Sequence, residues 1–328
     1  MTGSETIALI FELAFGHRPN ADEAAAVVSG LPAIAPDCYT YLVKLLQLRR
    51  TARSPDFDRL HELQTSALSQ ELERAQSLDR GDFETLYQGL FQDGRELVIG
   101  QAEYLPQHKE RFWELFNACA RVVEGRPQPH ILEFGTSEFT AFFKRLFPDA
   151  VLHLSDRPTP PGYIGFTEAV AARIADCDAY FAIDLERPSD IPAVPGLHQH
   201  AYDFIAMAEV LEHLVVNPVE LLKQLLRLLK PTGALYLTTP NLFRAELRQK
   251  WIAQENPNAI YPETGENWDR HHHHREFGAV ELLRFIHQAG GEIRAFYYSS
   301  CWDGGTIYPP DQRGNLVYLF APAASGQD

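Results

Sequence analysis

Three residues in the stretch AEVLEHLVV (208–216) have the types and spacing of a metal or acid–base site. Glu209, Glu212 and His213 lie at positions i, i+3 and i+4, so on a helix their side chains would share one face. Two carboxylates this close repel each other unless a positive charge lies between them. The spacing therefore predicts a divalent cation. The alternative is a helix pair in which His213 acts only as a general base.

A second set of possible ligands follows in the stretch WDRHHHHREF (268–277). Its histidine run, 271–274, comes after the turn sequence TTPN and before a predicted helix. Imidazole is a common metal ligand, so this run could supply the remaining ligand of the predicted site. It could equally be an exposed loop that binds nothing.

The segment HILEFGTSEFTAFF (130–143) has the features of a nucleotide-binding turn. An apolar run leads into Gly135 and a predicted helix, an arrangement that lets a ligand approach the backbone and the free N–H groups of the helix. Asp156 ends the next apolar run 21 residues after Gly135, the spacing at which a carboxylate can bind both hydroxyls of a ribose. Asp184 ends a third run, where it could meet the amine of an adenine.

The elements that must position these residues follow from the hydrophobic pattern. From residue 130 onward, short β-type runs alternate with amphipathic segments, which predicts an α/β fold with a parallel sheet and crossover helices. The runs IRAFYYSS (293–300) and NLVYLFAP (315–322), joined by a Gly/Pro-rich loop, predict an antiparallel C-terminal strand pair. Residues 1–91 show helical periodicity, so we expect a small all-helical N-terminal domain before a second domain over 92–328.

The charge and hydrophobicity of the sequence limit the kinds of molecule and membrane with which the protein could interact. The formal net charge of −15, from 44 acidic and 29 basic residues, would repel a polyphosphate backbone, which disfavours nucleic acid. No apolar run is long enough to predict a membrane span, and the N-terminus lacks the basic stretch of a signal peptide. We therefore expect a soluble, cytoplasmic protein. The pattern does not indicate an oligomeric state.

The region from about Tyr104 to Pro322 resembles the class I S-adenosylmethionine-dependent methyltransferases. The most specific stretch, YDFIAMAEVLEHLVVNPVELLKQLLRLLKPTGALYLTTPN (202–241), is similar to the fourth strand, helix, turn and fifth strand of that family. The resemblance implies a Rossmann-like, mostly parallel sheet of seven strands, and a set of cofactor-binding residues: Glu133 and Gly135 on the methionine and ribose side, Asp156 at the ribose and Asp184 at the adenine.

One part of the cofactor motif departs from the family pattern. The family's first motif usually has the form Glu-x-Gly-x-Gly-x-Gly, whereas Ser137 and Phe139 stand here at the second and third glycine positions. Ser137 could hydrogen-bond the carboxylate of the cofactor, because a hydroxyl at a helix N-terminus suits an anion. We expect S-adenosylmethionine to bind on the strength of the whole motif context.

The Glu-x-x-Glu-His element followed by His-x-x-Glu-Phe resembles the metal-dependent 2′-O-methyltransferases of small RNAs. The first element alone is also similar to the ubiquinone-pathway O-methyltransferases. The resemblance implies a metal site of Glu209, Glu212, His213 and His273, with Glu212 and His213 as the catalytic residues. Mixed carboxylate and imidazole ligands suit Mg²⁺, Mn²⁺ or Fe²⁺.

These features predict an O-methyltransferase that acts on a vicinal diol of a saccharide, glycolipid or small natural product. The polar insertion 242–269 carries Trp251, Tyr261 and Trp268, which could stack on such an acceptor or pack as a lid. A second possibility is a non-catalytic scaffold with a degenerate methyltransferase fold. A third is a methyltransferase acting on an RNA terminus, which the acidic charge disfavours.

Overall fold

The structure is a computed structural model that describes residues 55–91, 104–158, 167–256, 273–304 and 306–324. Its core is a seven-stranded sheet with the strand order β3-β2-β1-β4-β5-β7-β6. The strands are β1 (His130–Phe134), β2 (Val151–Asp156), β3 (Ala179–Ala182), β4 (Tyr202–Ala208), β5 (Leu229–Pro240), β6 (Gly291–Ser299) and β7 (Asn315–Pro322).

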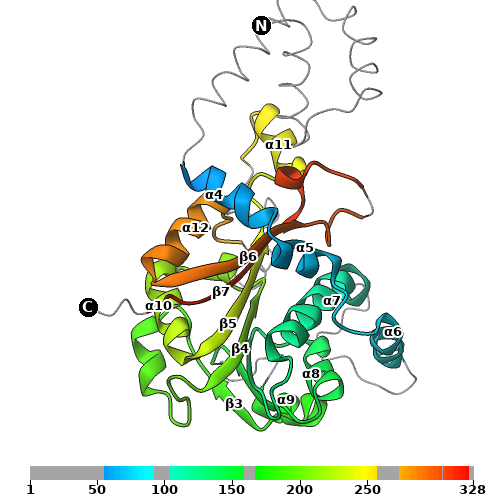
Figure 1. Ribbon diagram of the computed structural model, residues 1–328, viewed down its shortest axis with the longest axis vertical. Helices are drawn as coiled ribbons and strands as arrows, with labels where there is room; N and C mark the ends of the chain where they lie inside the picture. The colour runs from blue at the N-terminus through cyan, green and yellow to red at the C-terminus, as the bar shows by residue number, and fades with distance from the viewer. Residues whose placement is uncertain (1–54, 92–103, 159–166, 257–272, 305, 325–328) are drawn as a thin grey trace, which may run out of the picture.

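Helices cover both faces of this sheet (Figure 1). The α-helices are α4 (Pro55–Gln64), α5 (Ala67–Arg74), α6 (Arg80–Gly89), α7 (Tyr104–Val123), α8 (Phe142–Leu146), α9 (Glu168–Ala175), α10 (Pro218–Leu228), α11 (Ala245–Ile252) and α12 (Ala279–Gln288). Short 3₁₀ helices are η2 (Glu138–Ala141), η3 (Pro188–Ala193), η4 (Leu211–His213) and η5 (Pro310–Gln312).

The predicted α/β architecture is confirmed. Strands β1 to β5 pair in parallel, while β7 lies antiparallel between β5 and β6. The strand order reverses between β1 and β4: the chain runs from β1 to β2 toward one edge of the sheet, and from β4 to β5 toward the other edge. In open sheets of this kind a ligand binds at the carboxyl ends of the strands, at such a reversal point.

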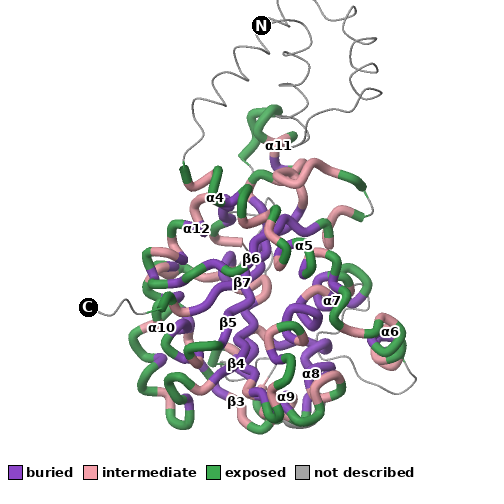
Figure 2. Tube along the Cα trace, viewed as in Figure 1, coloured by how far each residue is buried: buried purple, intermediate pink, exposed green. Residues whose placement is uncertain are grey.

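Alternating residues of the central strands divide the interior into two cores. Leu132 and Phe134 of β1 face the core shared with α4, α10 and α12, whereas Ile131 faces the core shared with α5 to α9. The sheet is buried throughout its centre while the outer faces of the helices are exposed (Figure 2). A strand covered on both faces reads as a continuous apolar run, as YDFIAMA in β4 does.

The described N-terminal helices contribute to the same two cores. Leu60 of α4 belongs to one core, and Phe83 of α6 packs against Trp113 and Phe116 of α7 in the other. Ser69 of α5 accepts a hydrogen bond from the backbone N–H of Phe296 in β6, the last strand of the sheet. Residues 1–54 lie outside the described part of the chain, so the division at residue 91 stays a prediction.

Among the residues that the structure describes, no helix combines the length and the apolar character needed to cross a membrane.

Candidate active site

The loop after β1 has the backbone conformation that its glycine predicts. Gly135 has a φ of +81°, and its N–H donates to the carbonyl of Ser155 at 3.1 Å. A Cβ at this position would lie 2.6 Å from Cγ2 of Val210, which follows β4. The turn therefore brings the backbone of β1 close to that of β4, at the reversal point of the sheet.

Glu133 places a carboxyl group in the interior beside this turn. Its residue is 2% exposed, and its Oε2 is buried with no hydrogen-bond partner among the described residues. Burial, offset in part by Thr140 and Arg111, raises the pKa of Glu133 to about 8. An unsatisfied buried acceptor calls for a donor, and the ammonium or ribose hydroxyls of S-adenosylmethionine would supply one.

Ser137 and Phe139 both make contacts that organise the loop. The Ser137 hydroxyl accepts from the N–H of Phe139 at 3.3 Å, and Thr140 Oγ1 accepts from the N–H of Ser137 at 2.9 Å, forming a capping box at η2. The Phe139 ring points into the core, stacked on Phe112 with centroids 4.2 Å apart. The third glycine position thus holds a side chain that packs in the core.

The two predicted nucleoside carboxylates follow their strands as expected. Asp156 ends β2, where it accepts hydrogen bonds from Thr136 Oγ1 at 2.9 Å and the N–H of Arg157 at 2.8 Å. Burial raises the pKa of Asp156. Asp184 lies two residues beyond β3, half-buried, and accepts from the N–H of Glu186 at 3.0 Å. Their roles toward a cofactor stay predictions.

The helix expected over AEVLEHL does not form. Glu209 adopts a left-handed conformation with a φ of +56°, and only the single 3₁₀ turn η4, Leu211–His213, follows. The N–H of Glu209 donates to the carbonyl of Thr238 in β5, so the chain is still tied to the sheet where a helix would begin. The i, i+3, i+4 face was therefore the wrong basis for grouping these residues.

Three of the four predicted metal ligands nevertheless come together. Single ligand atoms of Glu212, His213 and His273 all lie within 4.8 Å of one another. Glu209 is not part of this cluster, and its Oε1 accepts from Thr238 Oγ1 at 2.7 Å and from Asn315 Nδ2 at 2.9 Å. A tight 3₁₀ turn, and not a helix, thus brings Glu212 and His213 together with the sequence-distant His273.

Glu212 is the buried member of the cluster. One oxygen accepts from Thr239 Oγ1 at 3.0 Å, while Oε1 is buried without a hydrogen bond, 3.8 Å from His213 Nε2. Burial and the nearby Glu209 carboxylate raise the pKa of Glu212 well above its ordinary value. A cation bound at the cluster would satisfy this oxygen and hold the carboxylate ionised, so the donor set fits a metal.

The His-x-x-Glu-Phe element orients the histidine of the cluster. His273 Nδ1 lies 3.0 Å from Glu276 Oε1, and Glu276 is itself paired with Arg244. Such a carboxylate fixes the ring and leaves Nε2 for the cluster, as outer carboxylates do for many metal-binding histidines. His271 and His272 lie outside the described residues.

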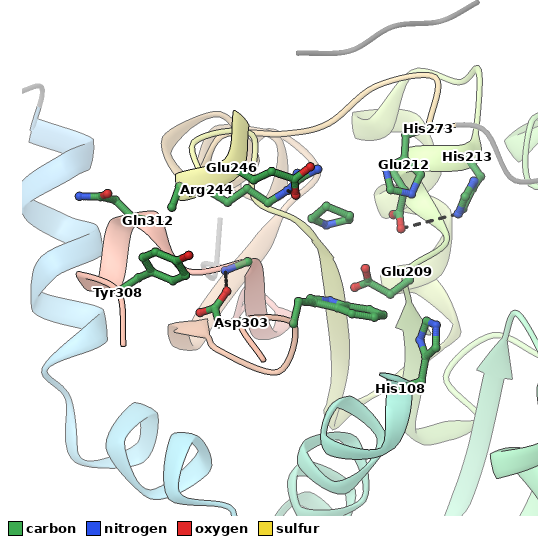
Figure 3. Close-up of a pocket in the computed structure, with 14 residues that line it drawn as sticks. His108, Glu209, Glu212, His213, Arg244, Glu246, His273, Asp303, Tyr308 and Gln312 are labelled. Carbon is green, nitrogen blue, oxygen red and sulfur yellow. Dashed lines mark hydrogen bonds and ion pairs between the residues drawn. The ribbon is translucent and has the colours of Figure 1, made fainter. Parts of the chain in front are cut away.

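The cluster opens into a cavity of about 440 Å³. Figure 3 shows Glu212, His213 and His273 on one side, with Asp303, Tyr308 and Gln312 on the other. The complete lining is His108, Glu209, Glu212, His213, Pro240, Arg244, Ala245, Glu246, His273, Trp302, Asp303, Tyr308, Gln312 and Gly314. A cavity of this size suits a small molecule or one or two sugar rings.

Several residues of the cavity wall were not predicted. They come from α7 and from the β6–β7 loop, distant in sequence from the metal elements: His108, Trp302, Asp303, Tyr308 and Gln312. The available signal was CWDGG, an aromatic and an acid next to glycines between two predicted strands. Trp251, by contrast, is 54% exposed on α11 and does not line the cavity, while Tyr261 and Trp268 lie outside the described residues.

The buried Arg111 of α7 was also missed. It is 4% exposed, and its Nη1 donates to the carbonyl of Ala208 at the end of β4, at 3.2 Å. Its positive charge acts on both Glu133 and Glu212, where it counters the rise of their pKa values. A basic residue within ERFWELF, next to apolar positions, was the sequence signal.

Comparison with known proteins gives one family match and many structural neighbours. Residues 110–295 match the family described as "Methyltransferase domain". Comparison with curated proteins gives no match.

Three solved structures illustrate the structural similarity, which is one of fold. The trans-methyltransferase CalH complexed with SAH is 19% identical, with a TM-score of 0.45 over 83% of this chain and 84% of that chain. The carbon methyltransferase CurJ is 15% identical, with a TM-score of 0.43 over 77% of this chain and 71% of that chain. The 1,6-didemethyltoxoflavin-N1-methyltransferase of Burkholderia thailandensis is 15% identical, with a TM-score of 0.41 over 74% of this chain and 88% of that chain.

The family match covers more than half of the chain and includes strands β1 to β5, the first part of β6 and the reversal point between β1 and β4. The chain therefore belongs to the methyltransferase-domain family and is a class I S-adenosylmethionine-dependent methyltransferase.

Proposed function

We propose that the chain methylates one oxygen of a vicinal diol on a saccharide, glycolipid or small natural product, assisted by a divalent cation. The observation that carries this proposal is the cluster of Glu212, His213 and His273. It combines a buried, unsatisfied carboxylate oxygen with two imidazoles in the wall of a cavity, beside the loop that follows β4. Such a donor set favours Mg²⁺, Mn²⁺ or Fe²⁺.

The chemistry asks little of the protein beyond positioning and proton removal. The acceptor oxygen attacks the methyl carbon, the carbon–sulfur bond breaks toward sulfur, and the hydroxyl proton goes to a base. A bound cation would supply Lewis acidity that lowers the pKa of a chelated hydroxyl. Glu212, His213 and His273 would hold the cation, and Glu276 would keep His273 oriented.

On the donor side, residues at the carboxyl ends of β1 and β2 and just after β3 would hold the cofactor. The unsatisfied oxygen of Glu133 would accept from its ammonium or ribose hydroxyls, and Asp156 would accept from the ribose diol. Asp184 would meet the adenine amine. The Ser137 hydroxyl accepts a backbone N–H in the capping box and can still donate its own proton to the cofactor carboxylate.

The test is methyl transfer from labelled S-adenosylmethionine to a panel of diols, with and without a chelator. We expect chelation to abolish turnover, and Mg²⁺, Mn²⁺ or Fe²⁺ to restore it. Glu212→Ala should abolish the metal-dependent turnover and leave the affinity for S-adenosylhomocysteine intact. Full activity in chelator would remove the cation from the mechanism.

Full activity in chelator would favour the alternative in which His213 acts as a general base without a metal. The distance between His213 and Glu212 supports this alternative. His213 Nε2 would then accept the hydroxyl proton directly, and Glu212, 3.8 Å away, would stabilise the imidazolium. The scaffold alternative has its own test, calorimetric titration with S-adenosylhomocysteine, in which it predicts no heat. Methylation of an RNA terminus is disfavoured by the carboxylates of the cavity, which would repel a phosphodiester chain.

A further inference from the structure

The loop between β6 and β7 forms the cavity wall that faces Glu212, His213 and His273, here called the Glu212 cluster. Its described residues, 300–304 and 306–314, contribute Trp302, Asp303, Tyr308 and Gln312 to the lining. Asp303, Tyr308 and Gln312 lie across the cavity from Glu212, His213 and His273 (Figure 3). An acceptor bound at the cluster would therefore extend toward this loop.

Two polar side-chain atoms, on consecutive residues of the loop, have no hydrogen-bond partner among the described residues. Trp302 Nε1 and Asp303 Oδ2 are both buried, and neither makes a hydrogen bond. The other oxygen of Asp303 is occupied, since it accepts from the N–H of Gly314 at 3.0 Å. Buried groups left unsatisfied in this way are uncommon and indicate a missing ligand or water. An indole N–H only donates and a carboxylate only accepts, whereas a hydroxyl group can meet both.

The surrounding contacts hold this pair in place. The Trp302 ring packs edge-to-face against His108, with centroids 4.5 Å apart at 89°, and the Arg111 guanidinium lies 5.7 Å from its centroid. A Cβ at Gly314 would lie 2.9 Å from the Trp302 Cβ, so only glycine lets β7 approach the loop this closely. A fixed donor and acceptor bind a ligand without first losing conformational entropy.

The charges of the cavity select against an anionic ligand. Glu209, Glu212, Glu246 and Asp303 all line it, while the guanidinium of Arg244 is already paired with Glu276. A sugar acid or a phosphorylated sugar would meet these carboxylates at short range, and a divalent cation at the cluster would offset only two of their four negative charges. A positively charged acceptor would be repelled by a cation at the cluster. A neutral ring with several hydroxyls meets neither penalty.

We infer that Trp302 Nε1 and Asp303 Oδ2 form a subsite that binds hydroxyl groups of a neutral saccharide ring, whose vicinal diol then faces the Glu212 cluster. The inference rests on the proposed function for the diol at the cluster. It makes Trp302 and Asp303 specificity-determining residues with no role in cofactor or cation binding.

Saturation-transfer NMR with methyl α-mannoside tests this subsite. The wild-type chain is saturated with S-adenosylhomocysteine and kept in chelator, so that binding is measured without the cation. Trp302→Phe keeps a ring but removes the N–H, and Asp303→Asn keeps an oxygen for Gly314. We expect affinity to fall about fivefold for the first and about tenfold or more for the second, as for neutral and charge-assisted hydrogen bonds. Trp251→Phe, outside the cavity, should bind as the wild type does.

A matched pair of ligands tests the charge argument. Methyl glucoside should bind at least about tenfold more tightly than methyl glucuronide, which adds one carboxylate. Unchanged mannoside affinity in both variants, equal binding of the glucuronide, or no signal for the wild type with either neutral glycoside would overturn the subsite. Thermal shifts with S-adenosylhomocysteine verify that each variant is folded. Turnover that does not depend on metal would instead refute the proposed cation. It would not affect the interpretation of these binding results, which are measured in chelator.

Discussion

Glu133 illustrates how a single buried group can be unfavourable in the free protein and useful in the complex. Its pKa of about 8 means that the carboxyl is mostly protonated at pH 7, because burial disfavours the charged form. A cofactor that donates hydrogen bonds to it would favour the ionised form. Cofactor binding near neutral pH should then release a proton from this residue.

The affinity for S-adenosylhomocysteine should therefore depend on pH in a defined direction. As the pKa of Glu133 is raised in the free protein and lowered in the complex, affinity should increase from pH 6 to about 8 and then level off. Calorimetry in buffers of different ionisation enthalpy should show proton release at pH 7. Glu133→Gln should lose this pH dependence and bind about 10- to 100-fold more weakly, the loss expected for a charge-assisted hydrogen bond.

The matched control is Glu124→Gln, whose side chain is 73% exposed beyond the end of α7. It should bind the ligand as the wild type does. A pH-independent affinity for the wild type, with no proton exchange, would contradict the assigned role of Glu133.

At the scale of elements, the loop from β1 into η2 and α8 shows why the family's glycines can be replaced. Phe139 occupies the third glycine position, but its ring is buried between α6 and α7, against Tyr87 and Phe112. The Ser137 capping box fixes the start of η2. The loop is thus stabilised by the same helices that cover this face of the sheet.

Restoring the family glycine should consequently harm the protein. Phe139→Gly removes a fully buried aromatic ring and should lower the free energy of unfolding by about 3–5 kcal/mol, without raising the affinity for S-adenosylhomocysteine. Ser137→Gly, which restores the second glycine, should cost less than about 1 kcal/mol because glycine is tolerated at an N-cap. Urea denaturation and calorimetry measure both quantities. Tighter cofactor binding by Phe139→Gly would show that the ring obstructs the crevice.

The same elements show how far the sequence could lead. The strands and their alternation with crossover helices were predictable because the apolar runs reflect burial on both faces, as in β4. The absence of a helix over AEVLEHL was not predictable, because the hydrogen bond from Glu209 to β5 and the left-handed backbone of Glu209 depend on tertiary pairing. Glu212, His213 and His273 were found through their motif. Trp302 and Asp303 were missed, because a loop between two strands carries no periodicity that marks a cavity wall.

At the scale of the whole molecule, the start of β4, at the end of the sheet opposite the predicted cofactor site, is a stabilising feature. Asp203, at the start of β4, accepts from the N–H of His130 at 2.9 Å and from Lys230 Nζ at 2.6 Å, and also pairs with Arg126. Its side chain is 3% exposed. This residue joins three consecutive parts of the sheet, β1, β4 and β5, far from the chemistry.

Asp203→Asn should destabilise the chain by about 2 kcal/mol at pH 7, less than for a fully buried pair because Lys230 and Arg126 are partly exposed. These donors lower the pKa of Asp203 below 3.8 despite its burial. Its contribution is thus complete above about pH 4 and is lost as pH falls through the folded-state pKa. Urea denaturation should show equal differences from the wild type at pH 7 and 5 and a smaller one at pH 3. The exposed control Asp149→Asn should change little, and a difference that persists at pH 3 would contradict this account.

The functional account depends on one arrangement, a cation cluster beside a cofactor crevice at the carboxyl edge of the sheet. Electron paramagnetic resonance titration of the metal-free chain with Mn²⁺, in the presence of S-adenosylhomocysteine, tests it most directly. We predict one bound Mn²⁺ per chain, at least about tenfold weaker binding in Glu212→Gln and His273→Ala, and unchanged S-adenosylhomocysteine affinity in both variants. Absence of stoichiometric Mn²⁺ binding, or equal binding by the two variants and the wild type, would contradict the account.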